Sequence, residues 1–175
     1  MTAHDQSDTA VSHTLVLVRH AKAESGGDID RERPLTPEGR ERAEKLAAWL
    51  SRKIDTPSII YYSPALRAEE TARAIKFRYP ASRYMVEPVL YHGDYVGSME
   101  FVRSLREHLT TVVIVGHEPI MSAVAMLLQN GDKVEQARKV MVGMPTGTAC
   151  IIDINVPWSD VTEGSGTFRT LKTVR

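Results

Sequence analysis

The stretch "LVLVRHAKAE", residues 15–24, decides the fold of this chain. Residues 15–18 form a continuous apolar run that is rich in β-branched side chains, which is typical of a strand covered on both faces of a sheet. The run ends directly in Arg19 and His20, two side chains that can carry positive charge. Either this is an ordinary polar strand end, or the strand directs reactive side chains into a crevice. The other motifs of the sequence have to distinguish these two interpretations.

The composition sets limits on the class of protein. The 175 residues are 42% hydrophobic and 25% charged, which is ordinary for a soluble globular protein of one domain. With 22 basic and 22 acidic residues the formal net charge is zero, so no global field would hold nucleic acid or an anionic membrane. Any anion site must therefore be local. Cys150 is the only cysteine, which excludes an internal disulfide framework and a cysteine-rich zinc site.

The N-terminal residues and the hydropathy pattern indicate the location of the protein. Residues 1–13 contain neither a basic region nor an apolar region of a secretory signal, and we expect a disordered tail there. Residues 14–175 are then predicted to form a single domain. No apolar run approaches the roughly 20 residues that a membrane span needs. We expect a cytoplasmic protein that binds neither nucleic acid nor a membrane.

Short apolar runs alternate with longer helical patterns along the chain. Strands are predicted at residues 14–18, 58–62, 84–90, 111–115, 148–155 and, as an edge strand, 167–174. Helices are predicted within residues 33–53 after a Thr36-Pro37 cap, after a second cap at Ser63-Pro64, and at residues 98–109 and 120–131. Residues 132–147 are ambiguous. This alternation predicts an α/β fold, a three-layer α/β/α sandwich around a mostly parallel mixed sheet.

Three predicted strands end in residues that can bind an anion. The first ends in Arg19 and His20, the fourth leads through glycine into His117 and Glu118, and the second leads into "SPALR", which places Arg67 in the first turn of a helix. Ligands of open α/β sheets bind beyond the carboxyl ends of the strands. Two histidines and two arginines should therefore meet in one crevice, together with a helix N-terminus, and such a site is complementary to a phosphoryl group.

Each of these residue types has a role available to it. Arginine keeps its proton and presents a planar fork to phosphate oxygens. Histidine titrates near roughly 6.5, so one ring nitrogen can be free to attack phosphorus at neutral pH. A backbone carbonyl bonded to the other ring nitrogen would fix the tautomer. A second histidine, if protonated, would stabilise the charge of the transition state.

The motifs resemble those of a known family. "LVLVRHAKAE" resembles the Arg-His-Gly/Ala signature of the histidine phosphatase superfamily, which also contains the cofactor-dependent phosphoglycerate mutases. "RPLTPEGRERA", "YYSPALRAEETA" and "VIVGHEPIM" resemble its later motifs in the same order. The Arg-His-Ala variant, the "RPLT" element and the short length are most similar to the SixA-type phosphohistidine phosphatase branch. The resemblance implies a phosphoglycerate mutase-like fold.

The resemblance also implies roles for individual residues. His20 would be the nucleophile and would pass through a phosphohistidine intermediate. The phosphoryl oxygens would be held by Arg19, Arg67 and His117. Arg33, in "RPLT", would present another cation to the phosphate, and Glu118 would be a hydrogen-bonding partner at the substrate. No metal and no organic cofactor is implied.

One feature departs from the family pattern. Many members use a carboxylate proton donor between the third strand and the next helix, where this sequence reads "EPVLYHGDY". Glu87 and Asp94 are the available acids, and neither has a mutase-like context. A phosphatase that cleaves a P–N bond has less need of a strong acid, because an imidazole leaving group can already carry a proton. We therefore expect protein phosphohistidine as the substrate.

Several alternatives stay open. The protein could be a small-molecule phosphomonoesterase, a phosphoglycerate mutase-like enzyme, a metallohydrolase that uses both crevice histidines, or a non-catalytic module that binds a phosphorylated ligand. The pair Asp28 and Asp30 could suggest Mg²⁺, but it follows "AESGG" rather than a buried strand, and we interpret it as a solvated turn. Arg33 could instead pair with these acids or with Glu32. The remaining histidines, expected at the surface, are His4, His13, His92 and His108.

Overall fold

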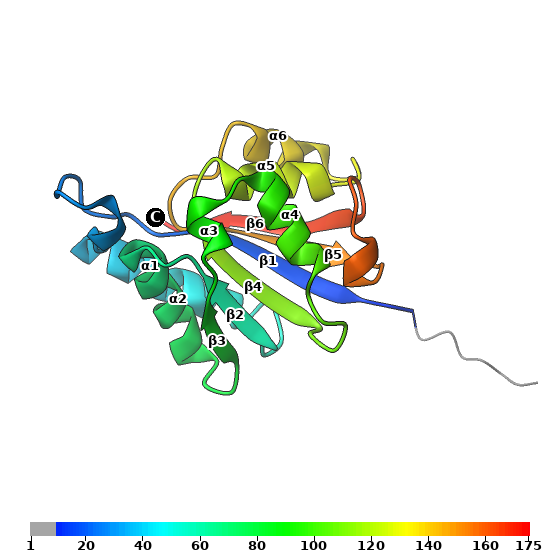
Figure 1. The fold of residues 1–175 in the computed structure, drawn as a ribbon, viewed down its shortest axis with the longest axis horizontal. Helices are drawn as coiled ribbons and strands as arrows, with labels where there is room; N and C mark the ends of the chain where they lie inside the picture. Colours follow the sequence, from blue (N-terminus) through cyan, green and yellow to red (C-terminus); the bar gives the residue numbers. More distant parts are fainter. Residues whose placement is uncertain (1–9) are drawn as a thin grey trace, which may run out of the picture.

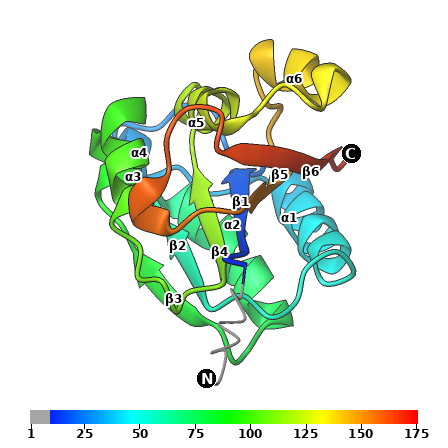
Figure 2. The same cartoon turned by 90° about the vertical axis from the view of Figure 1, so that its right-hand side faces the viewer.

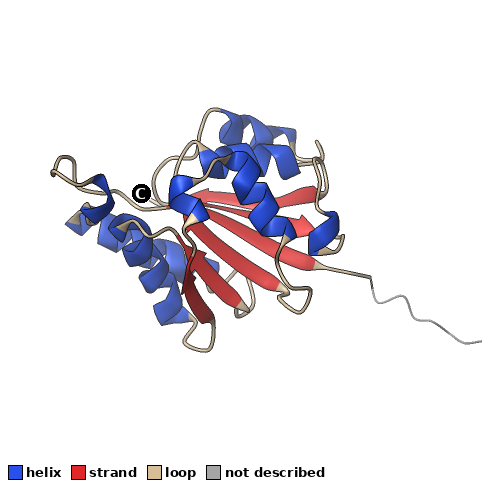
Figure 3. Cartoon of the chain, viewed as in Figure 1, coloured by secondary structure: helices blue, strands red, loops and turns tan. Residues whose placement is uncertain are grey.

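The computed structural model describes residues 10–175, which form one six-stranded mixed sheet with helices on both faces (Figures 1 and 3). The strands are β1 (His13–Arg19), β2 (Ile59–Tyr62), β3 (Arg83–Val86), β4 (Thr111–Gly116), β5 (Thr148–Ile154) and β6 (Gly166–Thr173). Their order is β3-β2-β4-β1-β5-β6, with β3, β2, β4 and β1 parallel and β5 antiparallel to both of its neighbours. The predicted mostly parallel mixed sheet with an edge strand at the C-terminal end is confirmed.

The helices form the two outer layers. They are α1 (Pro37–Leu50), α2 (Leu66–Arg78), α3 (Val89–His92), α4 (Tyr95–Arg103), α5 (Ile120–Leu128), α6 (Val134–Met141) and the short 3₁₀ helices η1 (Asp30–Glu32) and η2 (Trp158–Asp160). One face of the sheet packs on α1 and α2, and the other packs on α3 to α6 (Figure 2). The predicted three-layer sandwich is thereby confirmed. None of the helices between residues 10 and 175 is long and apolar enough to cross a membrane.

The central strand β1 explains why its sequence is apolar without alternation. The four apolar residues in its middle, Leu15, Val16, Leu17 and Val18, are all 0% exposed. The leucines pack in the core on the α4 and α5 side, whereas the valines pack on the α1 and α2 side. Both faces of the strand are therefore buried, and a polar residue can appear only where the strand leaves the sheet.

The strand register places the reactive ends together. Arg19 pairs with Gly116 of β4, and Tyr62 of β2 pairs with Val115 of the same strand. Beyond these pairs, the backbone N–H of His20 donates to the Gly116 carbonyl at 3.1 Å. The carboxyl ends of β1, β2 and β4 thus lie at one edge of the sheet, which is where ligands of this architecture bind.

The start of α1 is fixed against the segment that follows His20. The hydroxyl of Thr36 accepts a hydrogen bond from the Gly39 N–H at 2.9 Å, which is the predicted cap. A Cβ atom added at Gly39 would lie 2.0 Å from the carbonyl oxygen of Lys22. Only glycine permits this approach, so α1 packs directly on the backbone of the segment that follows His20.

Three predicted elements differ from the structure. The strand predicted at 84–90 ends at Val86 because the chain turns at Pro88 into the helical turn α3. The helix predicted from Ser63-Pro64 begins at Leu66, and the Ser63 side chain is used elsewhere. The helix predicted at 98–109 covers Tyr95–Arg103. The ambiguous segment 132–147 contains α6, a helix with only one fully buried residue.

The predicted N-terminal tail overlaps the first strand. Residues 1–9 and hence His4 lie outside the described residues, but β1 begins at His13, one residue before the predicted domain boundary. His13 is 4% exposed, so its predicted surface position is wrong. Its ring stacks on Trp158 with centroids 4.4 Å apart, and Nε2 lies 3.0 Å from Glu107. His92 and His108 are exposed, as predicted.

Candidate active site

All six predicted site residues line one cavity of about 320 Å³ at the carboxyl ends of the central strands. They are Arg19, His20, Arg33, Arg67, His117 and Glu118, and the lining is completed by Lys22, Ala23 and Thr146. The rings of His20 and His117 lie 5.1 Å apart, centroid to centroid. Segments that are far apart in the sequence are thus brought around one cavity, which has room for a phosphoryl group and part of the molecule that carries it.

The hydrogen bonds of His20 define its tautomer. Nδ1 lies 2.7 Å from the carbonyl oxygen of Ala21, which can only accept, so Nδ1 carries the proton. Nε2 then holds a lone pair, and it accepts a hydrogen bond from Nε of Arg67 at 3.3 Å. Burial, and secondarily the charges of His117, Arg67 and Arg19, lower the pKa of His20 to about 3. The ring is therefore neutral at neutral pH, with its free nitrogen directed at the Arg67 guanidinium.

The ring of His117 is held through its Nε2 atom. Its Nε2 lies 2.7 Å from Oγ of Ser63, and that hydroxyl accepts the N–H of Ala65 at 3.3 Å. When the Ser63 hydroxyl donates its hydrogen to Nε2, the ring proton lies on Nδ1, and Nδ1–H is then a donor without a partner among the described residues. Burial and the neighbouring Arg67 lower the pKa of His117 to about 4, so this ring is also neutral in the free site. Protonation of His117 requires a bound anion that raises this pKa.

Two donors at the cavity have no protein partner. Within residues 10–175, the buried Nε of Arg19 and the buried Nδ1 of His117 make no hydrogen bond. Arg19 is held from its other end, because Nη1 donates to the carbonyl of Met144 at 2.7 Å. Buried donors are almost always satisfied in native proteins. These two N–H groups are therefore well suited to an oxyanion in the cavity.

Arg67 is the buried cation of the site, 6% exposed in the first turn of α2. Its Nη1 donates to the backbone carbonyl of Asp30 at 2.8 Å, and Nη2 donates to the Asp30 carboxylate at 3.0 Å. The Arg67 carbonyl accepts from Thr71, whose hydroxyl in turn accepts the Ala21 N–H at 3.0 Å. Arg67 thus connects α2, η1 and the segment after His20.

Arg33 lines the cavity, as predicted, and it also forms an ion pair with Asp30, one of the alternative partners that the sequence offers. Nε and Nη2 donate to Oδ1 of Asp30 at 3.0 and 2.8 Å, and Nη1 donates to the Glu24 carbonyl at 2.8 Å. Asp30 also accepts from the hydroxyl of Tyr91 in α3 at 3.0 Å. The interpretation of the Asp28 and Asp30 turn as merely solvated is therefore wrong for Asp30. Asp28 is exposed.

The predicted acids have other partners. The Glu118 carboxylate lines the cavity, but it accepts from Ser122 in α5 and from the N–H of Met144 at 3.3 Å. It thus supports the loop whose carbonyl binds Arg19. Glu87 accepts the Val89 N–H at 3.2 Å, and Asp94 caps α4 by accepting the Gly97 N–H at 2.9 Å. Neither of these two residues lines the cavity.

Ser63, Asp30 and Tyr91 are site residues that sequence reasoning missed. Ser63 directly follows a predicted strand, and this position could have indicated a site residue. The Ser63-Pro64 pair instead predicts a helix cap. Tyr91 faces His117 with ring centroids 5.8 Å apart, and it comes from a segment predicted as a strand. No local pattern distinguishes Asp30 from its exposed neighbour Asp28.

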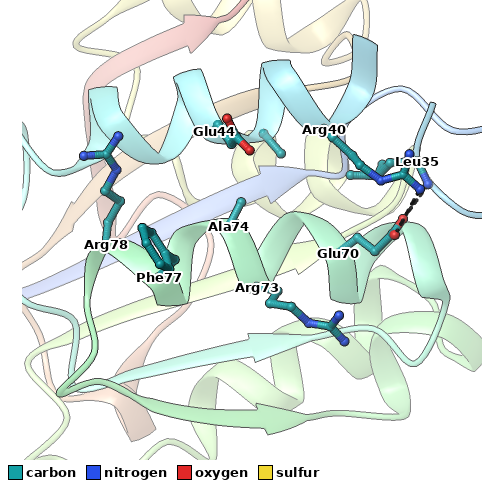
Figure 4. A pocket seen from close by; sticks show the side chains of 9 residues that line it. Leu35, Arg40, Glu44, Glu70, Arg73, Ala74, Phe77 and Arg78 are labelled. Atoms are coloured by element: carbon teal, nitrogen blue, oxygen red, sulfur yellow. Dashed lines mark hydrogen bonds and ion pairs between the residues drawn. The ribbon is translucent and has the colours of Figure 1, made fainter. Parts of the chain in front are cut away.

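A larger groove of about 510 Å³ lies outside this site, between α1 and α2 (Figure 4). It contains no histidine. Glu70 within it accepts the Leu35 N–H at 2.6 Å and pairs with Arg40 at 3.4 Å. This contact anchors the "RPLT" segment to α2. The smaller cavity is the candidate active site because it holds the neutral imidazoles and the unpartnered donors.

The fold and the cavity together define a class of protein: an α/β protein with a cavity lined by two histidines and three arginines, a lining that is complementary to a tetrahedral oxyanion. The Histidine phosphatase superfamily (branch 1) matches residues 15–89. An uncharacterised protein of Mycobacterium tuberculosis strain H37Rv is 31% identical over 150 residues, which cover 84% of this chain and 93% of that protein. The phosphohistidine phosphatase SixA of Escherichia coli K12 is 26% identical over 122 residues, 67% of this chain and 75% of that protein. The chain belongs to the histidine phosphatase superfamily, a class of phosphatases and mutases.

Solved structures support the same fold. A structure assigned to phosphohistidine phosphatase SixA from Nakamurella multipartitia superimposes with a TM-score of 0.82 at 23% identity, covering 93% of this chain and 96% of that one. The protein histidine phosphatase SixA complexed with tungstate gives 0.74 at 24% identity, covering 91% and 96%. A phosphoglycerate mutase from Plasmodium falciparum gives 0.65 at 17% identity, covering 91% and 90%. The predicted phosphoglycerate mutase-like fold is thus confirmed.

Proposed function

We propose that the protein is a metal-independent phosphatase that removes a phosphoryl group from phosphohistidine in a protein, with His20 as the nucleophile. The observation that carries this proposal is the hydrogen-bonding state of His20. Nδ1–H is bonded to the Ala21 carbonyl, and the lone pair of Nε2 is free in the cavity apart from a 3.3 Å contact with Arg67. A neutral imidazole with a fixed tautomer is the form that attacks phosphorus.

In the first step, Nε2 of His20 forms a bond to phosphorus while the bond from phosphorus to the leaving nitrogen breaks. Arg19 and Arg67 hold the phosphoryl oxygens, and Nδ1–H of His117 donates to them. His20 keeps its Nδ1 proton and becomes a phosphorylated imidazolium, whose positive charge the Ala21 carbonyl stabilises. In the second step, water attacks phosphorus and the P–N bond breaks, so that inorganic phosphate leaves and neutral His20 is restored.

The state of the carboxylates supports phosphohistidine as the substrate. Glu118 is engaged by Ser122 and Met144, and the hydrogen bonds from Arg33, Tyr91 and Arg67 hold the pKa of Asp30 far below its usual range. Among the described residues that line the cavity, no carboxylic acid is placed to protonate an alkoxide. When the phosphorylated imidazole of the substrate carries a proton on its second nitrogen, the ring leaves phosphorus as neutral imidazole. Its departure therefore needs no such acid.

The proposal is tested by activity on a generic aryl phosphate in the presence of EDTA. We expect wild-type turnover to be resistant to the chelator and His20→Ala to lose at least about a thousandfold in kcat, as other enzymes do without their nucleophile. His92→Ala, which changes an exposed histidine outside the cavity, is the matched control. Equal rates for the wild type and His20→Ala would refute the proposal, and loss of activity in EDTA would indicate a metallohydrolase.

The substrate class is tested by a panel of phosphohistidine peptides, phosphoserine peptides, 3-phosphoglycerate and sugar phosphates. We expect the highest kcat/KM on phosphohistidine peptides because they need no strong acid. A higher value on a sugar phosphate would identify a small-molecule phosphomonoesterase. Binding of a phosphopeptide without turnover would identify a non-catalytic module. A cytoplasmic location is the setting that we propose for a protein substrate.

A further inference from the structure

The carboxylate of Asp30 lies between the two guanidinium groups that the proposed mechanism directs at phosphate. Oδ1 accepts from Arg33 at 2.8 and 3.0 Å, and Oδ2 accepts from Arg67 at 3.0 Å and from Tyr91 at 3.0 Å. Asp30 is therefore an anion in contact with the cations of the site.

The contacts divide the cationic donors of the cavity into two sets. In Arg67, Nε donates to His20, Nη1 donates to the backbone carbonyl of Asp30, and Nη2 donates to the Asp30 carboxylate. In Arg33, two of the three nitrogens face Asp30. By contrast, Nε of Arg19 and Nδ1 of His117 have no partner within residues 10–175. An incoming oxyanion meets one set of open donors and one set whose charge is already matched by Asp30.

The carboxylate is the member of this cluster that can move. The Asp30 side chain is 53% exposed, whereas the Arg67 side chain is 7% exposed. Asp30 belongs to η1, which has no buried residue, and the preceding Ile29 is 54% exposed. Since η1 has no buried residue, polar contacts hold it against the site. They are the hydrogen bonds of Asp30 to Arg33, Arg67 and Tyr91, and a 3.4 Å hydrogen bond from Nε of Arg31 to the Pro64 carbonyl. An anion that takes over the arginine donors releases these bonds into water at small cost.

We propose that Asp30 is an internal counter-ion that competes with the phosphoryl group for Arg33 and Arg67, and that this competition weakens the binding of the product phosphate and speeds its release. The proposal rests on the proposed function, because it assumes that the cavity binds a phosphoryl group. Asp30 acts through the arginines and is not assigned a contact with the reacting atoms. In its absence the arginines would bind an oxyanion more tightly.

The test compares Asp30→Asn with Asp28→Asn. The asparagine keeps the shape of the side chain and removes the charge, and Asp28 is an exposed carboxylate two residues earlier in the same loop. The dissociation constant of inorganic phosphate is measured by calorimetry, and kcat, KM and product inhibition are measured on an aryl phosphate. We expect Asp30→Asn to bind phosphate about fivefold more tightly, the size of effect expected from an exposed ion pair. Its product inhibition constant should fall with it, and kcat should fall where release is limiting. Asp28→Asn should match the wild type.

A second variant, Tyr91→Phe, provides a test that does not depend on whether Asp30→Asn folds. Tyr91→Phe leaves the charge in place but removes one of the hydrogen bonds that hold the carboxylate, so phosphate affinity should rise by less than in Asp30→Asn. Thermal unfolding shows whether each variant is folded. If Asp30→Asn does not fold, Tyr91→Phe decides, and unchanged or weaker binding would overturn the proposal.

The outcomes are distinct. Weaker phosphate binding by a folded Asp30→Asn would mean that Asp30 orients the arginines for phosphate instead of competing with it. Unchanged binding, or an equal gain in Asp28→Asn, would also overturn the inference. A wild-type protein that neither binds phosphate nor turns over would instead refute the proposed function. Failure of the inference and failure of the function are thus separated by the wild-type control.

Discussion

At the scale of the residue, the site depends on two histidine side chains that stay neutral at neutral pH. His20 and His117 are buried among cations, and burial is the main cause that lowers their pKa values to about 3 and about 4. A lowered pKa keeps the nucleophile neutral and reactive at all pH values above that pKa. The same burial disfavours folding at low pH, because the histidines take up protons more readily in the unfolded chain. This destabilisation is absent above roughly pH 6.5 and grows as the pH falls towards the folded-state pKa values of about 4 and about 3.

A pH titration tests this state of His20. We expect its ring signal in the NMR spectrum of the free protein to stay constant from pH 8 to about pH 5, since the pKa of the folded state is about 3. The signal is assigned by its absence in His20→Ala. Inorganic phosphate should move the titration of His117 to higher pH, because a bound anion favours the charged ring. A His20 midpoint near roughly 6.5 would contradict the burial argument.

Ser63 provides a second prediction at this scale. Ser63→Ala removes the donor to Nε2 of His117, so the ring loses the bond that fixes its Nδ1–H tautomer. We expect kcat/KM on an aryl phosphate to fall about tenfold, which corresponds to one hydrogen bond. Ser104→Ala is the control, since the Ser104 hydroxyl bonds to Phe101 within α4. An unchanged kcat/KM for Ser63→Ala would show that His117 does not need this contact.

The predictability of the site depends on how each residue reaches it. Arg19 is the last residue of β1, and His20 and His117 directly follow β1 and β4, so the apolar runs before them are sufficient to place all three at one edge. Asp30 and Tyr91 reach the site only because their loops fold back over it, and no spacing rule connects them to His20. Long-range hydrogen bonds of this kind have no local signal.

At the scale of the element, the site depends on how firmly each strand end is held. The helix α1 contributes through Gly39, where the backbone approaches the carbonyl of Lys22. The predicted α1 start at Thr36-Pro37 was correct because a cap and an N-terminal proline are local signals. The β3 to α3 turn was mispredicted because the residues around Pro88 have the composition of a strand, and tertiary packing of Leu90 decides their conformation.

The Gly39 contact gives a prediction for α1. Gly39→Ala places a Cβ 2.0 Å from the Lys22 carbonyl, which is backbone and must move. We expect a loss of roughly 2 kcal/mol or more in the free energy of urea unfolding, the size of other overpacking effects, together with reduced activity, because the displaced segment follows His20. Glu44→Ala on an exposed position of the same helix is the control and should stay within about 0.5 kcal/mol. If Gly39→Ala were as stable as this control, α1 would not be fixed in the manner described.

At the scale of the whole molecule, β1 couples the two helical layers. Its leucines pack in one layer and its valines in the other, so neither layer can lose its packing without exposing the central strand. The mostly parallel sheet was predictable because buried parallel strands have an unmistakable apolar composition. The strand order and the antiparallel β5 were not predicted, since the composition of a buried strand does not specify its direction.

This coupling predicts that residues 14–175 unfold as one cooperative unit. The chain has two tryptophans: Trp49 packs with the α1 and α2 layer, whereas Trp158 is buried in the opposite layer. In Trp158→Phe the fluorescence reports only on the first layer, and in Trp49→Phe it reports only on the second. We expect the urea midpoint from fluorescence to equal the midpoint from far-UV circular dichroism within each variant, as two-state unfolding requires. Comparing two probes inside one variant removes the effect of the substitution on stability. Midpoints that differ between the probes would mean that the layers separate before the sheet unfolds, and the active site, which draws residues from both layers, would then lose its geometry first.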